Sequence, residues 1–251
     1  MSKTKIEWTQ QTWNPSAGCS KISQGCKNCY AETMANRLKA MGVHGYENGF
    51  NFSIVPSRLN APLKRKKPTV FFVNSMSDVF HKDMPEEYLD RIFEVIEQTP
   101  QHTYQILTKR ADRMYDYFSK NTVPSNVWLG VTVENKQQGL PRIDKLRHLK
   151  AKVLFLSIEP LLEDLGAINL TNIDWVIVGG ESGNRARPMD KKWVVSIKQQ
   201  CETLGIAFFF KQWGTWGEDK VKRKKKLNGK ELDGKIWQTY PDIIEQQFAV
   251  M

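Results

Sequence analysis

Cysteine and histidine are scarce in this sequence, with four of each among 251 residues. So few cysteines exclude a fold stapled by disulfides. No run approaches the ~18 consecutive apolar residues of a membrane-spanning helix. The N-terminal stretch MSKTKIEWTQQTWNP lacks the apolar centre and the small-residue cleavage site of a signal peptide. We therefore expect a cytoplasmic protein with reduced thiols and no membrane partner.

Acidic residues are also in the minority, because 27 Asp and Glu stand against 37 Lys and Arg, for a formal net charge of +10. Much of the excess lies in two runs, Lys64–Lys67 and Lys220–Lys226. A basic balance of this size favours a polyanionic partner, most often nucleic acid. We predict contact with DNA or RNA through these runs. Ordinary solvated charge is the alternative, and a protein partner stays open.

Six short apolar runs recur from residue 69 onward, separated by stretches of helical period. The runs are almost continuously apolar, which is typical of parallel strands covered on both faces. With one more strand in IEWTQQTW, they predict an α/β fold: a single βα-barrel, complete or incomplete, of about six to seven parallel strands. A doubly wound open sheet is the alternative. The runs are Thr69–Val73, Thr103–Leu107, Val127–Val131, Lys152–Leu156, Trp175–Val178 and Ile206–Phe210.

The barrel is expected over residues 1–215, followed by a basic C-terminal extension over residues 216–251. In this extension, LNGKELDGKIW carries Asn-Gly and Asp-Gly signals that predict a hairpin. Cys201 is predicted to be a core residue, because it shares a helical stripe with apolar neighbours that ends at Gly205. Two further helices are predicted to bury the faces formed by Leu89, Ile92, Phe93 and Ile96, and by Tyr30, Met34, Leu38 and Met41.

Polar side chains follow nearly every predicted strand. Active sites of βα-barrels lie at the C-terminal ends of the strands. Some of these side chains are equally explained as helix caps, among them Ser75, Thr108 and Asn135. Carboxylates and an ammonium gathered there need partners or a substrate to offset their desolvation. We predict Lys109 and Glu134 as catalytic residues, and as cofactor-binding residues Asn74, Asp78, Ser157, Glu159, Gly179, Gly180 and Glu181.

Three of the four cysteines, Cys19, Cys26 and Cys29, share one short loop with the spacing C-x₆-C-x₂-C. The closer pair matches the knuckles of both zinc and iron–sulfur sites. Three thiolates leave one coordination position for a further ligand, which on zinc could be His44, His81 or water. We favour an iron–sulfur cluster, with zinc or unliganded thiols as the alternatives.

The sequence resembles the phage-type three-cysteine-motif proteins, a family similar in appearance to radical S-adenosylmethionine (SAM) enzymes. The resemblance extends nearly the whole length to Pro241, and its motifs are TWNPSAGCSKISQGCKNCYAE, FLSIEPLL, WVIVGGESGNRARPM, FFFKQWG and LDGKIWQTYP. It implies a cytosolic βα-barrel with a [4Fe–4S] cluster on the three cysteines. The pattern departs from the usual radical SAM spacing C-x₃-C-x₂-C, and Gly-Gly-Glu follows the sixth strand here instead of the second.

These features lead to a first hypothesis, an iron–sulfur enzyme of radical SAM type that modifies or repairs a nucleic acid base or a nucleotide. Its cofactors would be the [4Fe–4S] cluster and SAM. A second hypothesis is a metal-stapled nucleic-acid-binding phage protein without catalysis. A third is a zinc-dependent hydrolase with Glu159 or Glu181 as its base.

Overall fold

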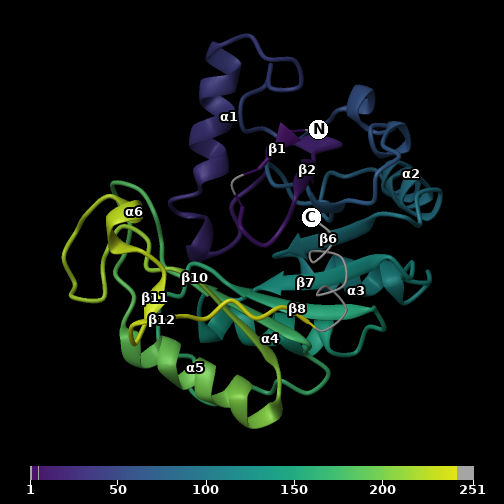
Figure 1. Ribbon diagram of the computed structural model, residues 1–251. Coiled ribbons are helices and arrows are strands. Elements are labelled where there is room, and N and C mark those ends of the chain that lie inside the picture. The colour runs from purple at the N-terminus through teal and green to yellow at the C-terminus, as the bar shows by residue number, and fades with distance from the viewer. Residues whose placement is uncertain (1, 5, 242–251) are drawn as a thin grey trace. The chain divides into compact units, whose positions relative to one another are not determined.

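The computed structural model describes residues 2–4 and 6–241 (Figure 1). Residues 242–251 of the predicted C-terminal extension lie outside this part of the chain. The chain folds into two compact units. Unit 1 holds the chain up to Ile22, together with Cys29–Gly130 and Leu149–Lys152, and unit 2 holds Ser23–Asn28, Val131–His148 and the chain from Val153 onward.

The main sheet, within the described residues, has the strand order β1-β2-β5-β6-β7-β8-β9-β10. β1 pairs antiparallel with β2, and the remaining seven strands are parallel and follow one another in chain order. This order is that of a βα-barrel sheet, because a doubly wound sheet reverses its order at a switch point. The predicted α/β class with about seven parallel strands is confirmed. The strands are β1 (Ser2–Lys3), β2 (Gln11–Trp13), β5 (Val70–Val73), β6 (Thr103–Thr108), β7 (Val127–Thr132), β8 (Val153–Ile158), β9 (Trp175–Gly179) and β10 (Ala207–Gln212).

The strands are buried along nearly their whole length, as continuous apolar runs require when both faces are covered. In unit 1, α2 (Glu86–Glu97) starts after Pro85 and carries two acids in its first turn, which favour a helix N-terminus. α2 buries the predicted face of Leu89, Ile92, Phe93 and Ile96. α3 (Ala111–Phe118) stacks Tyr117 on Phe93, with ring centroids 5.2 Å apart.

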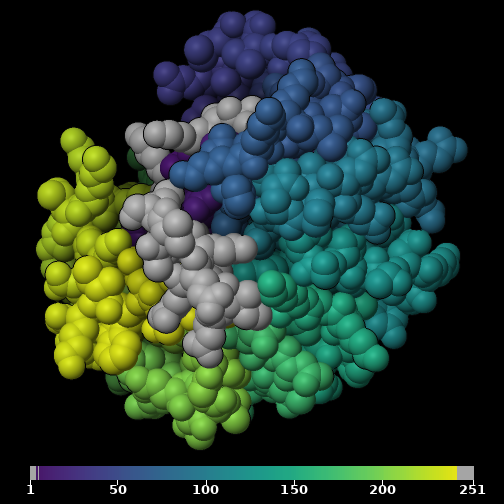
Figure 2. Space-filling model, turned by 45° about the vertical axis from the view of Figure 1, so that its right-hand side comes forward, coloured from purple at the N-terminus to yellow at the C-terminus, as the bar shows by residue number. Residues whose placement is uncertain are grey.

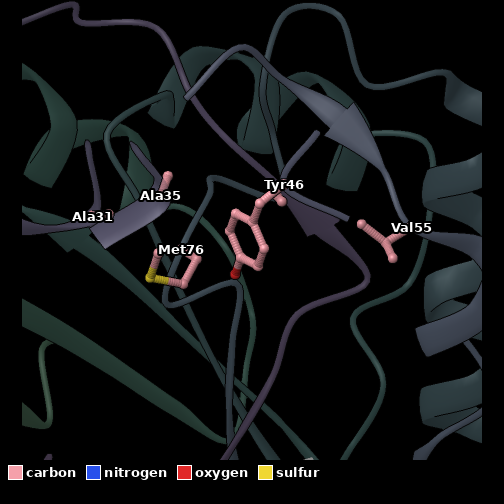
Figure 3. Close-up of a cluster of buried hydrophobic side chains, with 6 residues drawn as sticks. Ala31, Ala35, Tyr46, Val55 and Met76 are labelled. Carbon is pink, nitrogen blue, oxygen red and sulfur yellow. The ribbon is translucent and has the colours of Figure 1, made fainter. Parts of the chain in front are cut away.

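The predicted buried face of the first helix is wrong for Tyr30, Met34 and Met41, whereas Leu38 is half-buried and packs against buried residues of unit 1, as predicted. α1 (Tyr30–Ala40) leaves Tyr30 60% and Met34 41% exposed, and Met41 just beyond it is 64% exposed. The buried residues of this helix are Ala31 and Ala35. These alanines belong to a cluster with Ala17, Tyr46, Val55 and Met76, most of which Figure 3 labels. Their small side chains let neighbouring chain pack closely, so the larger apolar residues one position away face outward.

In unit 2, α4 (Lys136–Leu146) is capped by Asn135, whose side chain accepts a hydrogen bond from the backbone N–H of Gln138. α5 (Lys191–Leu204) lies against β10 (Figure 1) and ends at Gly205, whose φ of 67° is the left-handed conformation of a helix C-cap. α5 buries Cys201 completely, as predicted, whereas Leu204 at its end is 58% exposed.

The C-terminal part of unit 2 contains β11 (Glu231–Leu232) and β12 (Lys235–Ile236), which pair antiparallel. Asp233 and Gly234 join them with φ values of 53° and 70°, the positive angles of a tight hairpin turn. The surface in Figure 2 shows this part of the chain in yellow as one continuous area. The remaining short elements are β3 (Ser16–Ala17), β4 (Ser53–Ile54), α6 (Lys225–Asn228) and 3₁₀ turns η1 (Gln24–Cys26), η2 (Pro56–Arg58) and η3 (Pro62–Lys64). None of the described helices is long and apolar enough to cross a membrane.

Candidate functional site

The three loop cysteines lie between the first parallel strand and the first helix. Cys19 follows β3, Cys26 ends η1, and Cys29 is the residue before α1. None of the three is in a disulfide among the described residues, and all three are of intermediate exposure. Cys201 differs from them, because its burial raises the pKa of its thiol to about 12 and keeps it protonated. The accessible thiols are therefore the three that the sequence singles out.

The donor set suits an iron–sulfur cluster, because partly exposed thiols that are not in disulfides can become the thiolates that such clusters require. Over residues 2–4 and 6–241, no three His, Cys, Asp or Glu side chains form a group that could hold a metal ion. The fit of the cysteines to a cluster therefore rests on their chemistry and their spacing.

The two histidines considered as zinc ligands have other partners. The ring nitrogens of the exposed His44 are 3.0 Å from Glu47 Oε1 and 3.2 Å from Ser57 Oγ. His81 is buried, with its Nε2 at 2.8 Å from Ser20 Oγ and its Nδ1 accepting from the backbone N–H of Asp83. Burial, and then the charge of Arg110, lower the pKa of His81 to about 4, so the ring is neutral at pH 7. Both contact sets disfavour a zinc site completed by histidine.

Cys19 lies beside the largely buried guanidinium of Arg110 in unit 1. Arg110 Nη1 donates to Cys19 Sγ at 3.5 Å, and its Nη2 donates to the carbonyl and hydroxyl oxygens of Ser20 at 3.0 and 2.9 Å. The pKa of Arg110 is raised: burial opposes the charge, but Asp78 and Cys19 outweigh it. A positive charge next to sulfur stabilises a thiolate relative to a thiol. This environment suits a metal-ligating cysteine.

Asp78 is fully engaged inside unit 1. Its Oδ1 accepts from the Thr108 hydroxyl at 2.7 Å and the backbone N–H of Phe80 at 3.0 Å. Its Oδ2 accepts from Arg110 Nη1 at 3.0 Å and from the backbone N–H of Lys109 at 3.2 Å. Two predicted site residues, Asp78 and Lys109, are thus brought together. The contact uses the main chain of Lys109, so Asp78 fixes the end of β6.

Asn74 also has a local structural role. It adopts a positive φ of 59° after β5, a conformation that asparagine tolerates better than most residues. Its side chain donates to Ser16 Oγ at 3.0 Å and ties β5 to the segment that leads to Cys19. The contact therefore places this predicted cofactor-binding residue next to the start of the cysteine loop.

Each of the three predicted carboxylates in unit 2 is paired with a cation of the same unit. Glu134 follows β7 and pairs with Arg142, with no exposure of its side chain. Glu159 follows β8 and pairs with Lys211 at 2.6 Å, keeping 21% of its side chain exposed. Glu181 follows β9 and pairs with Arg187 at 2.6 Å, with 6% exposed. The partners that these carboxylates need are therefore provided by the chain itself, and Glu159 is the most accessible of the three.

Glu181 makes the densest set of contacts. Arg187 donates to both carboxylate oxygens, at 2.6 and 2.9 Å, and its backbone N–H adds a third bond at 2.8 Å. Asn28 Nδ2 donates to Oε2 at 3.1 Å. Burial tends to raise the pKa of Glu181, but the hydrogen bonds from Arg187 and Asn28 outweigh it and lower the pKa. Glu181 is ionised at pH 7 and bound to its own loop.

The glycines after β9 are explained by close packing. A Cβ on Gly180 would meet the backbone oxygen of Trp213 at 1.9 Å, and a Cβ on Gly179 would meet Glu159 Oε1 at 3.2 Å. Only glycine fits at position 180, because the obstructing atom is backbone. Ser157 is buried within β8. The structure thus brings together Gly179 and Glu159, two of the predicted cofactor-binding residues.

Sequence reasoning missed Arg142 and Arg187, the partners of two predicted carboxylates. Arg142 lies inside α4, where a buried arginine looks like any exposed one in sequence. Arg187 could have been found, because it lies six residues after Glu181 in a Gly-rich loop. Ser23 and Asn28 were also missed, although both lie within the cysteine loop.

Comparisons with known proteins gave one family and one group of structures. A family model described as "Protein of unknown function (DUF5131)" matches residues 3–241. No curated protein matches the sequence. Two matched structures are spore photoproduct lyase complexed with dinucleoside spore photoproduct and a cysteine-to-serine mutant of spore photoproduct lyase. Each is 14% identical and covers 79% of this chain and 62% of the lyase, with TM-scores of 0.47 and 0.48. The chain thus spans less than two thirds of the length of these proteins.

Proposed function

We propose that this chain, which belongs to the DUF5131 family, is an iron–sulfur enzyme of radical SAM type acting on a nucleic acid base or a nucleotide. The observation that supports this most strongly is the set of three accessible thiols, Cys19, Cys26 and Cys29, at the first strand-to-helix connection of a parallel sheet. These three thiolates would hold a [4Fe–4S] cluster, which would supply the electron for cleaving SAM.

The chain's own residues would hold the cofactors. Arg110, fixed by Asp78, stabilises the Cys19 thiolate. Glu159 would accept the SAM ammonium, because it is the most exposed of the three paired carboxylates of unit 2. The ammonium would replace Lys211, which donates to the two Glu159 oxygens at 2.9 and 2.6 Å. Gly179 lies against Glu159 and leaves the end of β9 without a side chain. The ammonium group of Lys109 would bind an anionic group of the substrate.

The proposed nucleic-acid contact rests on exposed lysines. In the second basic run, Lys220 pairs with Asp190, Lys222 donates to the carbonyl of Asn184, and Arg223 pairs with Asp219. The run Lys224–Lys226 is exposed and, among the described residues, makes no hydrogen bond or ion pair through its side chains. Lysines of this kind are available to neutralise phosphates. Within Lys64–Lys67, the three lysines are exposed in the same way.

Replacing Lys224, Lys225 and Lys226 together with glutamine is expected to flatten the salt dependence of binding to single-stranded and double-stranded DNA or RNA. The log–log slope should fall by about one unit for each lost phosphate contact, because each neutralised phosphate releases counterions. Fluorescence anisotropy over a salt series measures the slope. The matched control replaces Lys220 and Lys222, which already have partners, and should change the slope less. Equal slopes for wild type and the triple variant would show these lysines to be ordinary surface charge.

One observation favours a second candidate function, a metal-stapled nucleic-acid-binding protein without catalysis. The strand-end carboxylates Asp78, Glu134, Glu159 and Glu181 are all paired with basic residues of their own unit. A structural role explains such pairs without any substrate. The two candidates differ in whether the bound metal site reacts with SAM.

The metal content of protein purified without air tests the proposed function. We expect a brown protein with about four irons and matching sulfide per chain, the content of one [4Fe–4S] cluster. Iron, sulfide and zinc assays on the same sample measure it. A colourless protein with stoichiometric zinc, which takes up no iron on reconstitution, would contradict the proposal and favour a zinc knuckle.

A further inference from the structure

The chain segment that contains Cys26 is hydrogen-bonded to the rest of unit 2 through three of its residues. We call residues 23–28 the Cys26 segment. The Ser23 hydroxyl donates to Glu134 Oε1. The backbone N–H of Gln24 donates to Gln138 Oε1 at 3.1 Å, and Asn28 Nδ2 donates to Glu181 Oε2 at 3.1 Å. Two of these three partners are carboxylates: Glu134, which the sequence predicts to be catalytic, and Glu181, which it predicts to bind a cofactor.

The Glu134 side chain is fully buried. Arg142 donates both to Glu134 Oε2 and to the backbone carbonyl of Thr132 at the end of β7. A Cβ on Gly25 would lie 2.4 Å from Glu134 Cγ, so the Cys26 segment rests directly on this carboxylate. Both oxygens of Glu134 are therefore used inside unit 2, one by Arg142 and one by Ser23.

Glu181 and its partner Arg187 contact the Cys26 segment at Asn28 and at Gln24. Arg187 is bound to both oxygens of Glu181, and its Nη2 also donates to the Gln24 carbonyl at 3.1 Å. Asn28 Nδ2 reaches Glu181 and also the backbone carbonyl of Arg185 at 2.8 Å. The segment is thus tied through both its main chain and a side chain.

We propose that Glu134 and Glu181 are positioning residues that fix the Cys26 segment and thereby orient the Cys26 thiol as a metal ligand. Their oxygens are taken up by Arg142, Arg187 and the segment itself, which leaves them poorly placed to receive a SAM ammonium. The part of this inference that concerns the cluster rests on the proposed function. The part that concerns the segment does not, because the contacts that hold it need no metal.

The first test follows the reactivity of Cys26 in the full chain without added metal. Glu181→Gln removes the charge from the Asn28–Glu181 contact, and Asn28→Ala removes its donor. In both variants N-ethylmaleimide should label Cys26 about tenfold faster, the effect of losing one charged hydrogen bond. Peptide mapping by mass spectrometry gives the rate for each cysteine. Buried Cys201 should stay unlabelled, which shows that the fold is intact. Glu202→Gln on α5 is the matched control, because that paired carboxylate makes no described contact with the segment.

The effects of Glu181→Gln and Asn28→Ala should combine to less than their sum, because the contact between the two side chains is weakened or lost in both single variants. Glu134→Gln should also speed Cys26 labelling, provided Cys201 stays protected. Unchanged labelling of Cys26 in Glu181→Gln and Asn28→Ala would overturn the inference, even if the wild type binds a cluster.

The second test separates positioning from contact with SAM. In cluster-loaded protein, Glu181→Gln should release iron to a chelator several-fold faster, while the affinity for SAM per loaded cluster, measured by calorimetry, stays that of the wild type. Loss of SAM affinity with an unchanged rate of iron release would assign Glu181 to SAM and overturn the inference. A wild type that takes up no iron would refute the proposed function alone, because the labelling test would still decide the inference.

Discussion

Replacing Cys26 with alanine is expected to reduce the iron content of anaerobically reconstituted protein from about four per chain to nearly none. A cluster held by only three thiolates loses a third of its protein ligands, and the one cysteine outside this set, Cys201, is far from Cys26 in sequence. Iron and sulfide assays with the visible absorbance of the cluster measure the loss. Cys19→Ala and Cys29→Ala should have the same effect.

Cys201→Ala is the matched control for these variants. Cys201 is buried on α5, so its replacement should leave the iron content unchanged and affect only the stability of the core. If Cys26→Ala retained its iron while Cys201→Ala lost it, the assignment of the metal ligands would be wrong.

Replacing Arg142 with methionine should lower the free energy of unfolding by about 3–5 kcal/mol, because it leaves the Glu134 carboxylate buried without its cation. Urea denaturation followed by circular dichroism measures this loss. The double variant Arg142→Met with Glu134→Gln should recover part of the stability, since no uncompensated charge then remains in the interior. A single variant less than about 1 kcal/mol below wild type would show that Glu134 is not committed to this pair.

The strands could be predicted well because their signal is local. A parallel strand covered on both faces is buried along its whole length and mostly apolar, as Val153–Ile158 and Trp175–Gly179 are. The face that a helix buries is set by its neighbours, which sequence does not show. On α1 the predicted face of Tyr30 and Met34 is exposed, because the chain around Tyr46 packs on the alanines instead.

The candidate site could be predicted in part for the same reason. The spacing of the cysteines is local, and the accessible thiols are the ones it indicates. Carboxylates at strand ends are also visible in sequence. Their partners are not, because Arg142 and Arg187 are brought to Glu134 and Glu181 only by the fold. Sequence alone therefore identifies charged groups near a site without showing which of them remain available to a ligand.

The most direct test of the proposed function is whether the reduced, cluster-loaded protein converts SAM to 5′-deoxyadenosine. We predict formation of 5′-deoxyadenosine, detected by mass spectrometry, that requires reductant and is lost in Cys19→Ala, Cys26→Ala and Cys29→Ala. Addition of DNA, RNA or nucleotides should increase its rate if one of them is the substrate. An intact cluster that neither binds nor cleaves SAM under these conditions would contradict the radical SAM assignment and leave the non-catalytic, metal-stapled binding protein as the better explanation.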